Sequence, residues 1–309
     1  MEKLSGSVSP THAMATFNLI QLPVELVHRV ALHCDLLSLL ALRITCKSLR
    51  VEVTTLLQAE KKALLAFYVS LPDNLWQHLE GACTVVGGLA ALSFVLRSPE
   101  LRPPSLDVFI ASDQEQFLEQ WLEQDTALQL QDGTTEVWDL HDGDEMRLHV
   151  AQMRTYVCQN GRSISIHTSR SLSPLDPIAA SVTTALCNWV SPVVFACGYP
   201  ALTFKLRSVG RDVFRRNTSI GMLYAHLVSS GFEIQSDPSA WEDYNALVPE
   251  STSDYHQSCM RSLYLCPNQA RFFGDPGSIV AVVDSEATDH VVLRGSHQPP
   301  YGITIRFFR

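Results

Sequence analysis

The stretch from residue 83 to residue 110, CTVVGGLAALSFVLRSPELRPPSLDVFI, places the strongest constraint on the fold. Its β-branched start predicts a short buried strand, and Gly87 and Gly88 predict a turn in which the backbone approaches a neighbour closely. A short apolar helix follows. Residues 106–110 then alternate in polarity as a strand does, with Asp107 on one face. The sequence thus predicts that the Asp107 carboxylate lies beside the glycine turn.

Length and composition bound the class of protein. The chain has 309 residues, of which 46% are hydrophobic, which suits packed cores and about two domains of ~150 residues each. Its net charge of −9 argues against a nucleic-acid partner, because general nucleic-acid affinity comes largely from neutralising phosphates. No apolar run approaches the ~20 residues that cross a bilayer, and the first residues lack the apolar centre of a secretory signal. We therefore expect no membrane partner and a cytoplasmic or nuclear location.

The N-terminal part predicts three short apolar helices. Pro23 suits the start of a helix at Val24, since its missing N–H would be unpaired there anyway. A second helix is expected after Asp35 and a third from near Cys46. Helices this apolar cannot all cover one another, so we expect part of their surface to meet a partner.

These helices resemble an F-box. The family pattern is Leu-Pro followed by Glu, an aliphatic pair, an Asp-x-x-Ser-Leu turn and a Cys-Lys element, and this chain supplies Leu22, Pro23, Glu25, Leu26, Val30, Leu36, Ser38, Leu39, Leu42, Cys46, Lys47 and Leu49. The resemblance implies docking onto the Skp-type adaptor of a cullin-based ubiquitin ligase, for which the chain would recruit an unknown target protein. The implied partner contacts are Leu22, Pro23, Leu26, Val30, Leu36, Leu39 and Leu42. The alternative is that these helices only cap the larger domain.

The second part of the chain resembles another family. In the nucleotidyltransferase fold, a glycine turn receives a nucleoside triphosphate and a following Asp-x-Asp strand holds two metal ions, and the stretch 83–110 has this form. Residues 173–203 and 266–278 look like segments of a nucleotidyltransferase-like family common in mushroom-forming fungi, often found behind an F-box. The matching residues are Pro174, Leu175, Pro177, Ile178, Asn188, Tyr199, Pro200, Leu202, Thr203, Cys266, Pro267, Arg271, Asp275, Gly277 and Ser278.

The resemblance departs from an active pattern at the metal-binding positions. Ser105 stands at the first position of Asp-x-Asp, and the strand expected at 163–169 contains His167 but no acid. Two metal ions need several carboxylates around them, so the resemblance implies a pseudoenzyme domain that serves recognition. Two alternatives stay open: a metal-dependent nucleotidyltransferase with Asp107 as its catalytic residue, and a nucleotide-binding sensor. An active site would take Mg2+ and nucleotide, and no metal site is assigned. The nucleotide-binding candidates are Gly87, Gly88, Ser105, Asp107, Arg211 and Arg215.

Two pairs of charged residues have helical spacing. Arg211 and Arg215 are four residues apart and would share one face of a helix, where they could clamp a triphosphate or a phosphorylated partner. The alternative is that they belong to a solvated basic face. Arg271 and Asp275 are also four residues apart, and we expect them to pair with each other.

Other segments carry simpler signals. Residues 146–156 and 163–168 predict two strands joined by a turn at Asn160-Gly161. Residues 112–122 predict a helix opened by a capping box, and apolar residues at helical spacing predict a helix over 178–190. The C-terminal runs predict a small antiparallel sheet, with strands at 279–284, 291–294 and 302–308.

Together these signals predict an α+β chain. A small N-terminal three-helix F-box precedes a nucleotidyltransferase-like mixed α/β domain with a β-rich C-terminal end. The expected boundaries are a disordered tail at 1–16, the F-box at 17–58, a helical connector at 59–80 and the larger domain at 81–309. The connector is aromatic rather than rich in Gly and Ser, which predicts rigid coupling between the two parts.

Overall fold

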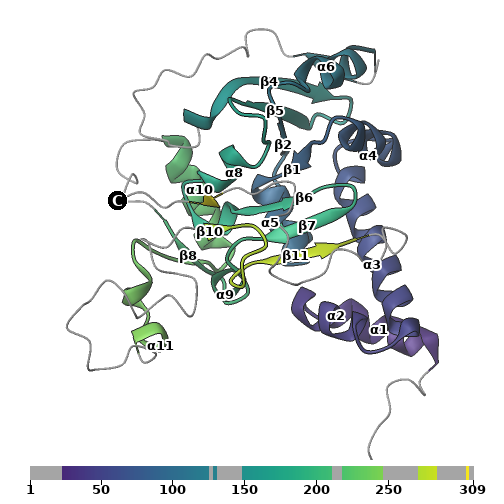
Figure 1. Cartoon of the computed structure of the whole chain (residues 1–309), viewed down its shortest axis with the longest axis vertical. Helices are drawn as coiled ribbons and strands as arrows, with labels where there is room; N and C mark the ends of the chain where they lie inside the picture. Colours follow the sequence, from purple (N-terminus) through teal and green to yellow (C-terminus); the bar gives the residue numbers. More distant parts are fainter. Residues whose placement is uncertain are drawn as a thin grey trace, which may run out of the picture.

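The structure, a computed structural model, describes residues 23–124, 128–130, 148–210, 218–245, 271–283 and 304–305. Helices form the N-terminal part of this chain, and a mixed sheet with shorter helices forms most of the rest (Figure 1). The predicted mixed α/β architecture is therefore confirmed, with the helices first. The tail predicted at 1–16 lies outside the described residues.

Four helices open the described chain, and each begins where the sequence provides a start. Pro23 is the N-cap residue of α1, and Pro72 is the first residue of α4, where its missing N–H costs nothing. At α2, the Asp35 carboxylate accepts a hydrogen bond of 2.7 Å from the backbone N–H of Ser38, which satisfies an amide that the helix leaves unpaired. The helices are α1 (Val24–His33), α2 (Leu36–Arg43), α3 (Lys47–Ala66) and α4 (Pro72–Gly81).

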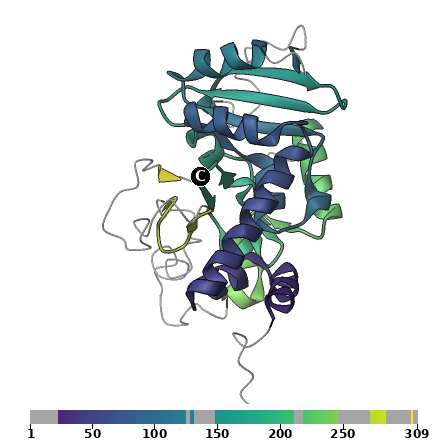
Figure 2. The same ribbon diagram turned by 90° about the vertical axis from the view of Figure 1, so that its right-hand side faces the viewer.

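The long helix α3 joins the two parts of the molecule. It has 20 residues and continues through the predicted boundary at residue 58. Figure 2 shows that α3 runs from α1 and α2 toward the end of the molecule that holds β4 and β5. Leu57, Leu64 and Leu65 of α3 are buried in one cluster with side chains of the sheet. Within the described chain, the N-terminal helices and the sheet therefore share a hydrophobic core. None of the described helices combines the length and the hydropathy needed to cross a membrane.

The main sheet runs in the order β11-β7-β6-β1-β2-β5-β4-β3. β2 and β5 are parallel, and the other neighbouring pairs in this sheet are antiparallel. The strands are β1 (Val85–Val86), β2 (Ser105–Ile110), β3 (Leu128–Leu130), β4 (Val150–Cys158), β5 (Ser163–Ser169), β6 (Asn188–Val190), β7 (Val194–Cys197) and β11 (Ile279–Val282). Two small sheets pair β8 (Arg207–Val209) with β9 (Glu233–Gln235), and β10 (Arg271–Phe272) with β12 (Thr304–Ile305).

The remaining helices are short. They are α5 (Gly88–Val95), α6 (Glu115–Gln124), α8 (Asp176–Ala179), α9 (Pro200–Thr203), α10 (Thr218–Ser229) and α11 (Glu242–Asn245), with 3-10 turns at Pro99–Leu101, Thr184–Leu186 and Pro238–Ala240. Of these helices, α11 lies away from the main sheet, at the lower left of Figure 1. The predictions of a helix after the glycine turn and of a helix within 112–122 are thus confirmed.

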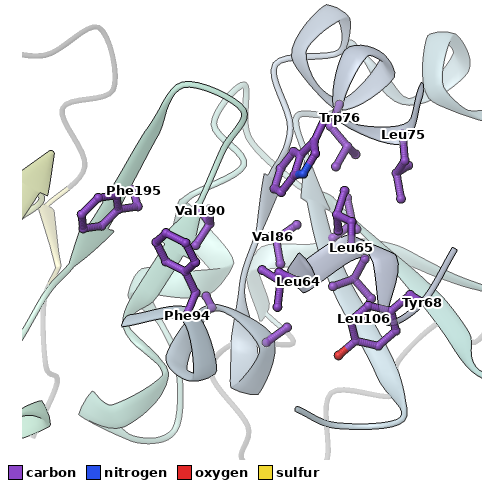
Figure 3. Close-up of a cluster of buried hydrophobic side chains, with 14 of the residues drawn as sticks. Leu64, Leu65, Tyr68, Leu75, Trp76, Val86, Phe94, Leu106, Val190 and Phe195 are labelled. Atoms are coloured by element: carbon purple, nitrogen blue, oxygen red, sulfur yellow. The ribbon is translucent and has the colours of Figure 1, made fainter. Parts of the chain in front are cut away.

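The alternation predicted for β2 is confirmed. Leu106, Val108 and Ile110 are buried in the cluster that contains side chains of α3 and α5, and Figure 3 shows Leu106 close to the helix residue Leu65. Phe109 lies in a second cluster on the opposite face of the sheet. Asp107 shares the face of Phe109, because side chains two positions apart on a strand point the same way.

The hairpin predicted at Asn160-Gly161 is also confirmed. β4 and β5 pair antiparallel across it, and Gly161 has a φ of +78°, which suits glycine. β4 begins at Val150, later than predicted. The sequence did not indicate β3, because that strand lies in an acid-rich stretch with turn signals.

The helix predicted over 178–190 is wrong. The segment holds the end of α8, the 3-10 turn Thr184–Leu186 and the strand β6. Every residue from 177 to 190 is buried, so no exposed face gives a period that distinguishes helix from strand. Hydroxyl groups satisfy part of the irregular backbone here: Thr184 Oγ1 accepts from the N–H of Val209 at 2.9 Å, and Ser208 Oγ accepts from the N–H of Ala185 at 3.0 Å.

The C-terminal strands are arranged differently from the predicted small sheet. β11 pairs antiparallel with β7 and forms an edge of the main sheet. β10 and β12 do form a small antiparallel pair, and the run at 291–294 lies outside the described residues.

Arg271 pairs with Asp275 as predicted: Nε lies 2.5 Å from Oδ2, and Nη2 lies 3.0 Å from Oδ1. Nη2 also donates to the carbonyl oxygen of Gly198 at 2.8 Å, which ties β10 to the end of β7.

Candidate functional site

Asp107 lies beside the glycine turn, as predicted. The backbone N–H of Gly87 donates to the carbonyl oxygen of Asp107 at 2.9 Å. Gly88 has a φ of +60°, and a Cβ atom built on it would lie 2.5 Å from Asp107 Oδ2. A side chain at this position would therefore be strained and would collide with the carboxylate. Both glycines permit the close approach of the turn to β2.

His167 is the nearest ionisable partner of Asp107 among the described residues. Its Nε2 lies 3.1 Å from Asp107 Oδ1, and the His167 side chain is 8% exposed against 35% for Asp107. The imidazole ring stacks on Phe109, with ring centres 4.7 Å apart and an interplanar angle of 16°. The parallel pairing of β2 with β5 produces this arrangement, because it places Phe109 directly opposite His167. The carboxylate is thus half-buried, with one oxygen held by the imidazole.

Hydroxyl groups occupy the strand positions next to Asp107. Ser105 Oγ lies 3.0 Å from Ser165 Oγ, and Ser165 Oγ lies 3.3 Å from Thr155 Oγ1, so a row of hydroxyls crosses β2, β5 and β4. No local sequence pattern distinguishes Ser165 or Thr155. Only the strand register places these two residues near Asp107: Ser165 of β5 is opposite Asp107, and Thr155 of β4 is opposite Ser165.

The donor set around Asp107 does not fit a two-metal centre. Two divalent ions about 3.5–4 Å apart need several anionic oxygen ligands, whereas this row offers one carboxylate, neutral hydroxyls and an imidazole. Within the described ranges, no three His, Cys, Asp or Glu side chains converge into a metal-binding group. The arrangement suits hydrogen bonding to a ligand or to a partner's polar groups.

The proposed basic clamp is described only in part. Arg211 and Arg215 lie outside the described residues. Of the same basic run, Lys205 Nζ lies 2.8 Å from Asp243 Oδ2 and Arg207 Nη1 lies 2.6 Å from Asp243 Oδ1. Hydrogen bonds from Lys205 and then Arg207 lower the pKa of Asp243. These two cations are therefore engaged by an acid in the described chain.

The predicted partner contacts divide into exposed and internal residues. Leu22 lies outside the described residues. Pro23 is exposed, and Leu26 and Val30 are 43% and 40% exposed. By contrast, Leu36 and Leu39 are buried in the shared core, and Leu42 packs partly buried against it. The assignment of Leu36 and Leu39 as partner contacts is corrected, because side chains without exposed surface support the helix from inside.

Three of the predicted contacts are exposed, namely Pro23, Leu26 and Val30, and we call them the α1 stripe. These residues are spaced i, i+3 and i+7, so they share one side of the helix. Val27 and Ala31 of α1 are buried instead. Further apolar side chains are exposed nearby in sequence, namely Val24, Leu32, Leu37 and Ile44. Single exposed apolar residues are common on protein surfaces, so the number of them in α1 and α2 is the feature to explain.

Polar contacts fix the helices that carry the α1 stripe to the sheet part of the molecule. Arg97 follows α5 and binds Glu60 of α3, with Nη2 at 2.5 Å from Oε1. Its Nη1 donates to the carbonyl oxygen of Ala31 at 3.0 Å and also to that of Cys34. It therefore meets the carbonyl groups at the end of α1, where a cation is favourable.

A second set of contacts holds the C-terminal end of α3. Tyr68 Oη donates to the carbonyl oxygen of Pro103 at 2.9 Å, and Asn160 Nδ2 donates to that of Tyr68 at 3.0 Å. Arg162 donates to the carbonyl oxygen of Phe67 and lies over its ring. These contacts support the predicted rigid coupling of helices and sheet.

Comparisons of the chain with protein-family models, with curated proteins and with solved structures found no match. The interpretation of both regions therefore rests on the geometry of the described residues and on the residue patterns of the sequence.

Proposed function

We propose that this chain is an F-box adaptor. Its first helices would dock on the Skp-type subunit of a cullin-based ubiquitin ligase, and its nucleotidyltransferase-like part would recognise a target protein. The observation that carries the proposal is the α1 stripe, an exposed apolar surface built from three of the residues that the F-box pattern assigns to the adaptor.

Burial on a partner gives this surface a physical role. Fully burying an aliphatic side chain of this size stabilises by about 1.5–3 kcal/mol. More than half of the surface of Leu26 and of Val30 is already buried within the chain, so only the exposed remainder can contribute on docking. Each would contribute about 1 kcal/mol on docking. The further exposed residues Leu32 and Leu37 extend the apolar surface beyond the stripe.

The polar ties between helices and sheet support a role as an adaptor. Arg97 joins α1 and α3 to the segment after α5, and Tyr68 and Asn160 join the end of α3 to the sheet. A ubiquitin ligase must hold its target within reach of the transfer site. A short, firmly held connection between the docking helix and the recognition domain meets this requirement better than a flexible linker.

The neutral row beside Asp107 supports recognition rather than nucleotide transfer for the sheet part. Ser105 and Ser165 use their hydroxyls on each other, and His167 holds one oxygen of Asp107. Such groups can bind a partner's amides, hydroxyls or phosphates without a metal ion. We infer that this face of the sheet is a pseudoenzyme site.

Reconstitution with a purified Skp-type adaptor tests the docking proposal. The full chain should form a stoichiometric complex on size-exclusion chromatography. The double substitution Leu26→Asp with Val30→Asp should remove the complex, because it places two charges in the apolar contact. The matched control is Met222→Asp with Val228→Asp, which makes the same change on α10 at side chains that are 64% and 57% exposed.

Loss of the complex only in the α1 variant supports the proposal, provided that both variants unfold at the same temperature as the parent chain. A folded α1 variant that still binds the adaptor would remove the F-box assignment. Failure of the parent chain to bind the adaptor would do the same.

A nucleotide-binding sensor is the second candidate, and the left-handed conformation of Gly88 at the start of α5 favours it. Turns of this kind can present backbone N–H groups to an anion. The test is the shift in unfolding temperature on adding ATP with magnesium, measured for the parent chain and for Asp107→Asn. We expect no shift in either protein. A clear shift that Asp107→Asn abolishes would make nucleotide chemistry the leading proposal.

A further inference from the structure

A pocket of about 300 Å³ lies on the face of the sheet that carries Phe109. Its floor comes from four neighbouring strands, β1, β6, β7 and β11, which run side by side in the sheet. The end of α4 and the segment before α8 form walls. The residues on which the argument depends are Val85, Trp189, Val194 and Val280 on the floor, with Leu79 and Cys83 at the side.

The lining is apolar and aromatic, with few polar groups. Phe273 packs edge-on against Trp189, with ring centres 5.9 Å apart, so the pocket has a rigid aromatic corner. The indole N–H of Trp189 is buried and has no hydrogen-bond partner. This N–H has almost no accessible surface, so Trp189 offers the pocket the apolar part of its ring rather than a hydrogen-bond donor.

The volume and the charge at the mouth restrict the ligand. A volume of about 300 Å³ is at the lower end of the range for small-molecule sites, and it is too small for an amphipathic helix. The exposed carboxylate of Glu80 lies at the edge of the pocket and disfavours anions. We propose that this pocket binds an uncharged, largely apolar small molecule.

This site is independent of the docking proposal. The α1 stripe contributes no residue to the pocket, and neither does Asp107. The pocket lies on the same face of the sheet as Asp107, and Val85 on its floor pairs across the strands with Phe109, the residue on which His167 stacks. The ligand would therefore sit next to the pseudoenzyme site without occupying it.

Prodan, an uncharged naphthalene ketone whose emission depends on polarity, is a suitable probe. Titrated into the full chain, it should show saturable, blue-shifted emission at one site per chain. Val280→Phe should weaken this binding by about tenfold or more, because a larger side chain fills the pocket from the sheet edge. The matched control Val157→Phe makes the same change on β4, at a side chain that is 37% exposed and does not line the pocket. The control should leave the affinity unchanged.

A second measurement uses the unsubstituted chain, so it does not depend on the folding of a variant. Cys83 is an exposed free thiol that lines the pocket, whereas Cys46 is a free thiol elsewhere, at the start of α3. Saturating Prodan should slow alkylation of Cys83 by iodoacetamide, read by mass spectrometry, and should leave the rate at Cys46 unchanged. Non-saturable emission, equal binding by Val280→Phe, or unprotected Cys83 would overturn the proposal.

Discussion

Arg97 provides the sharpest test of how the N-terminal helices are held to the sheet. Its guanidinium is 9% exposed and contacts Glu60 through Nε at 3.0 Å and Nη2 at 2.5 Å. Its Nη1 donates to the carbonyl oxygen of Ala31 at 3.0 Å. Arg97→Ala removes these bonds and leaves the Glu60 carboxylate, which is 26% exposed, without this cation.

The magnitude follows from this burial. Removing one partner of a buried ion pair costs about 3–5 kcal/mol, because the other charge is left uncompensated. Glu60 keeps some contact with water, which lowers the cost, so we expect the free energy of unfolding to fall by about 2–4 kcal/mol. At about 2–4 °C per kcal/mol for a chain of this size, the unfolding midpoint should fall by about 4–16 °C.

The assay compares thermal and urea unfolding of Arg97→Ala with that of Arg102→Ala. Arg102 donates a single described hydrogen bond, to the carbonyl oxygen of Ala63 at 3.2 Å, so its removal should cost about 1 kcal/mol. Hydrogen exchange should also quicken in α1 of the first variant and stay unchanged in α10. A loss below about 0.5 kcal/mol, the usual range for surface substitutions, would refute the tie through Arg97.

Three other substitutions test local features of the fold. Gly88→Ala should cost more stability than Gly161→Ala in urea unfolding, since both have positive φ but only the first brings a Cβ within 2.5 Å of a carboxylate; equal losses would contradict the close approach. The Ser38 N–H lowers the pKa of Asp35, so the stabilisation is present above the usual carboxyl pKa and is lost as pH falls through the lowered value. Asp35→Ala should therefore cost about 1 kcal/mol at neutral pH and almost nothing in strong acid, and a constant difference would contradict the cap. Asp275→Ala should lower the free energy of unfolding by about 3–5 kcal/mol, because it removes the carboxylate that balances the charge of the buried Arg271; calorimetry showing a near-neutral effect would contradict the buried pair.

The region around Asp107 was predictable because its signals are local. Strand residues alternate in any tertiary context, so the faces of Asp107 and Phe109 could be assigned from their positions alone. The glycine pair likewise predicted a close backbone approach. The contact with His167 was not predictable, because the partner lies 60 positions later in the chain and depends on the register of β5 against β2.

Where every face of a segment is buried, sequence patterns fail. Residues 178–190 have apolar side chains at helical spacing, yet those side chains are buried both in a 3-10 turn and in β6. Periodicity reports the contrast between solvent and core, and this segment has no such contrast. The position of β11 at the edge of the main sheet is a second case, since its pairing with β7 is set by tertiary packing.

The apolar residues that match the F-box pattern include both buried and exposed side chains, and the sequence pattern alone does not distinguish them. Leu36 and Leu39 are enclosed in the shared core, whereas Leu26 and Val30 face outward. Substituting the first pair would create cavities and cost about 2–5 kcal/mol each, so lost adaptor binding there could reflect unfolding. Substituting the second pair changes exposed surface alone. The docking proposal therefore depends on Leu26 and Val30, where a loss of binding without a loss of stability identifies an interface.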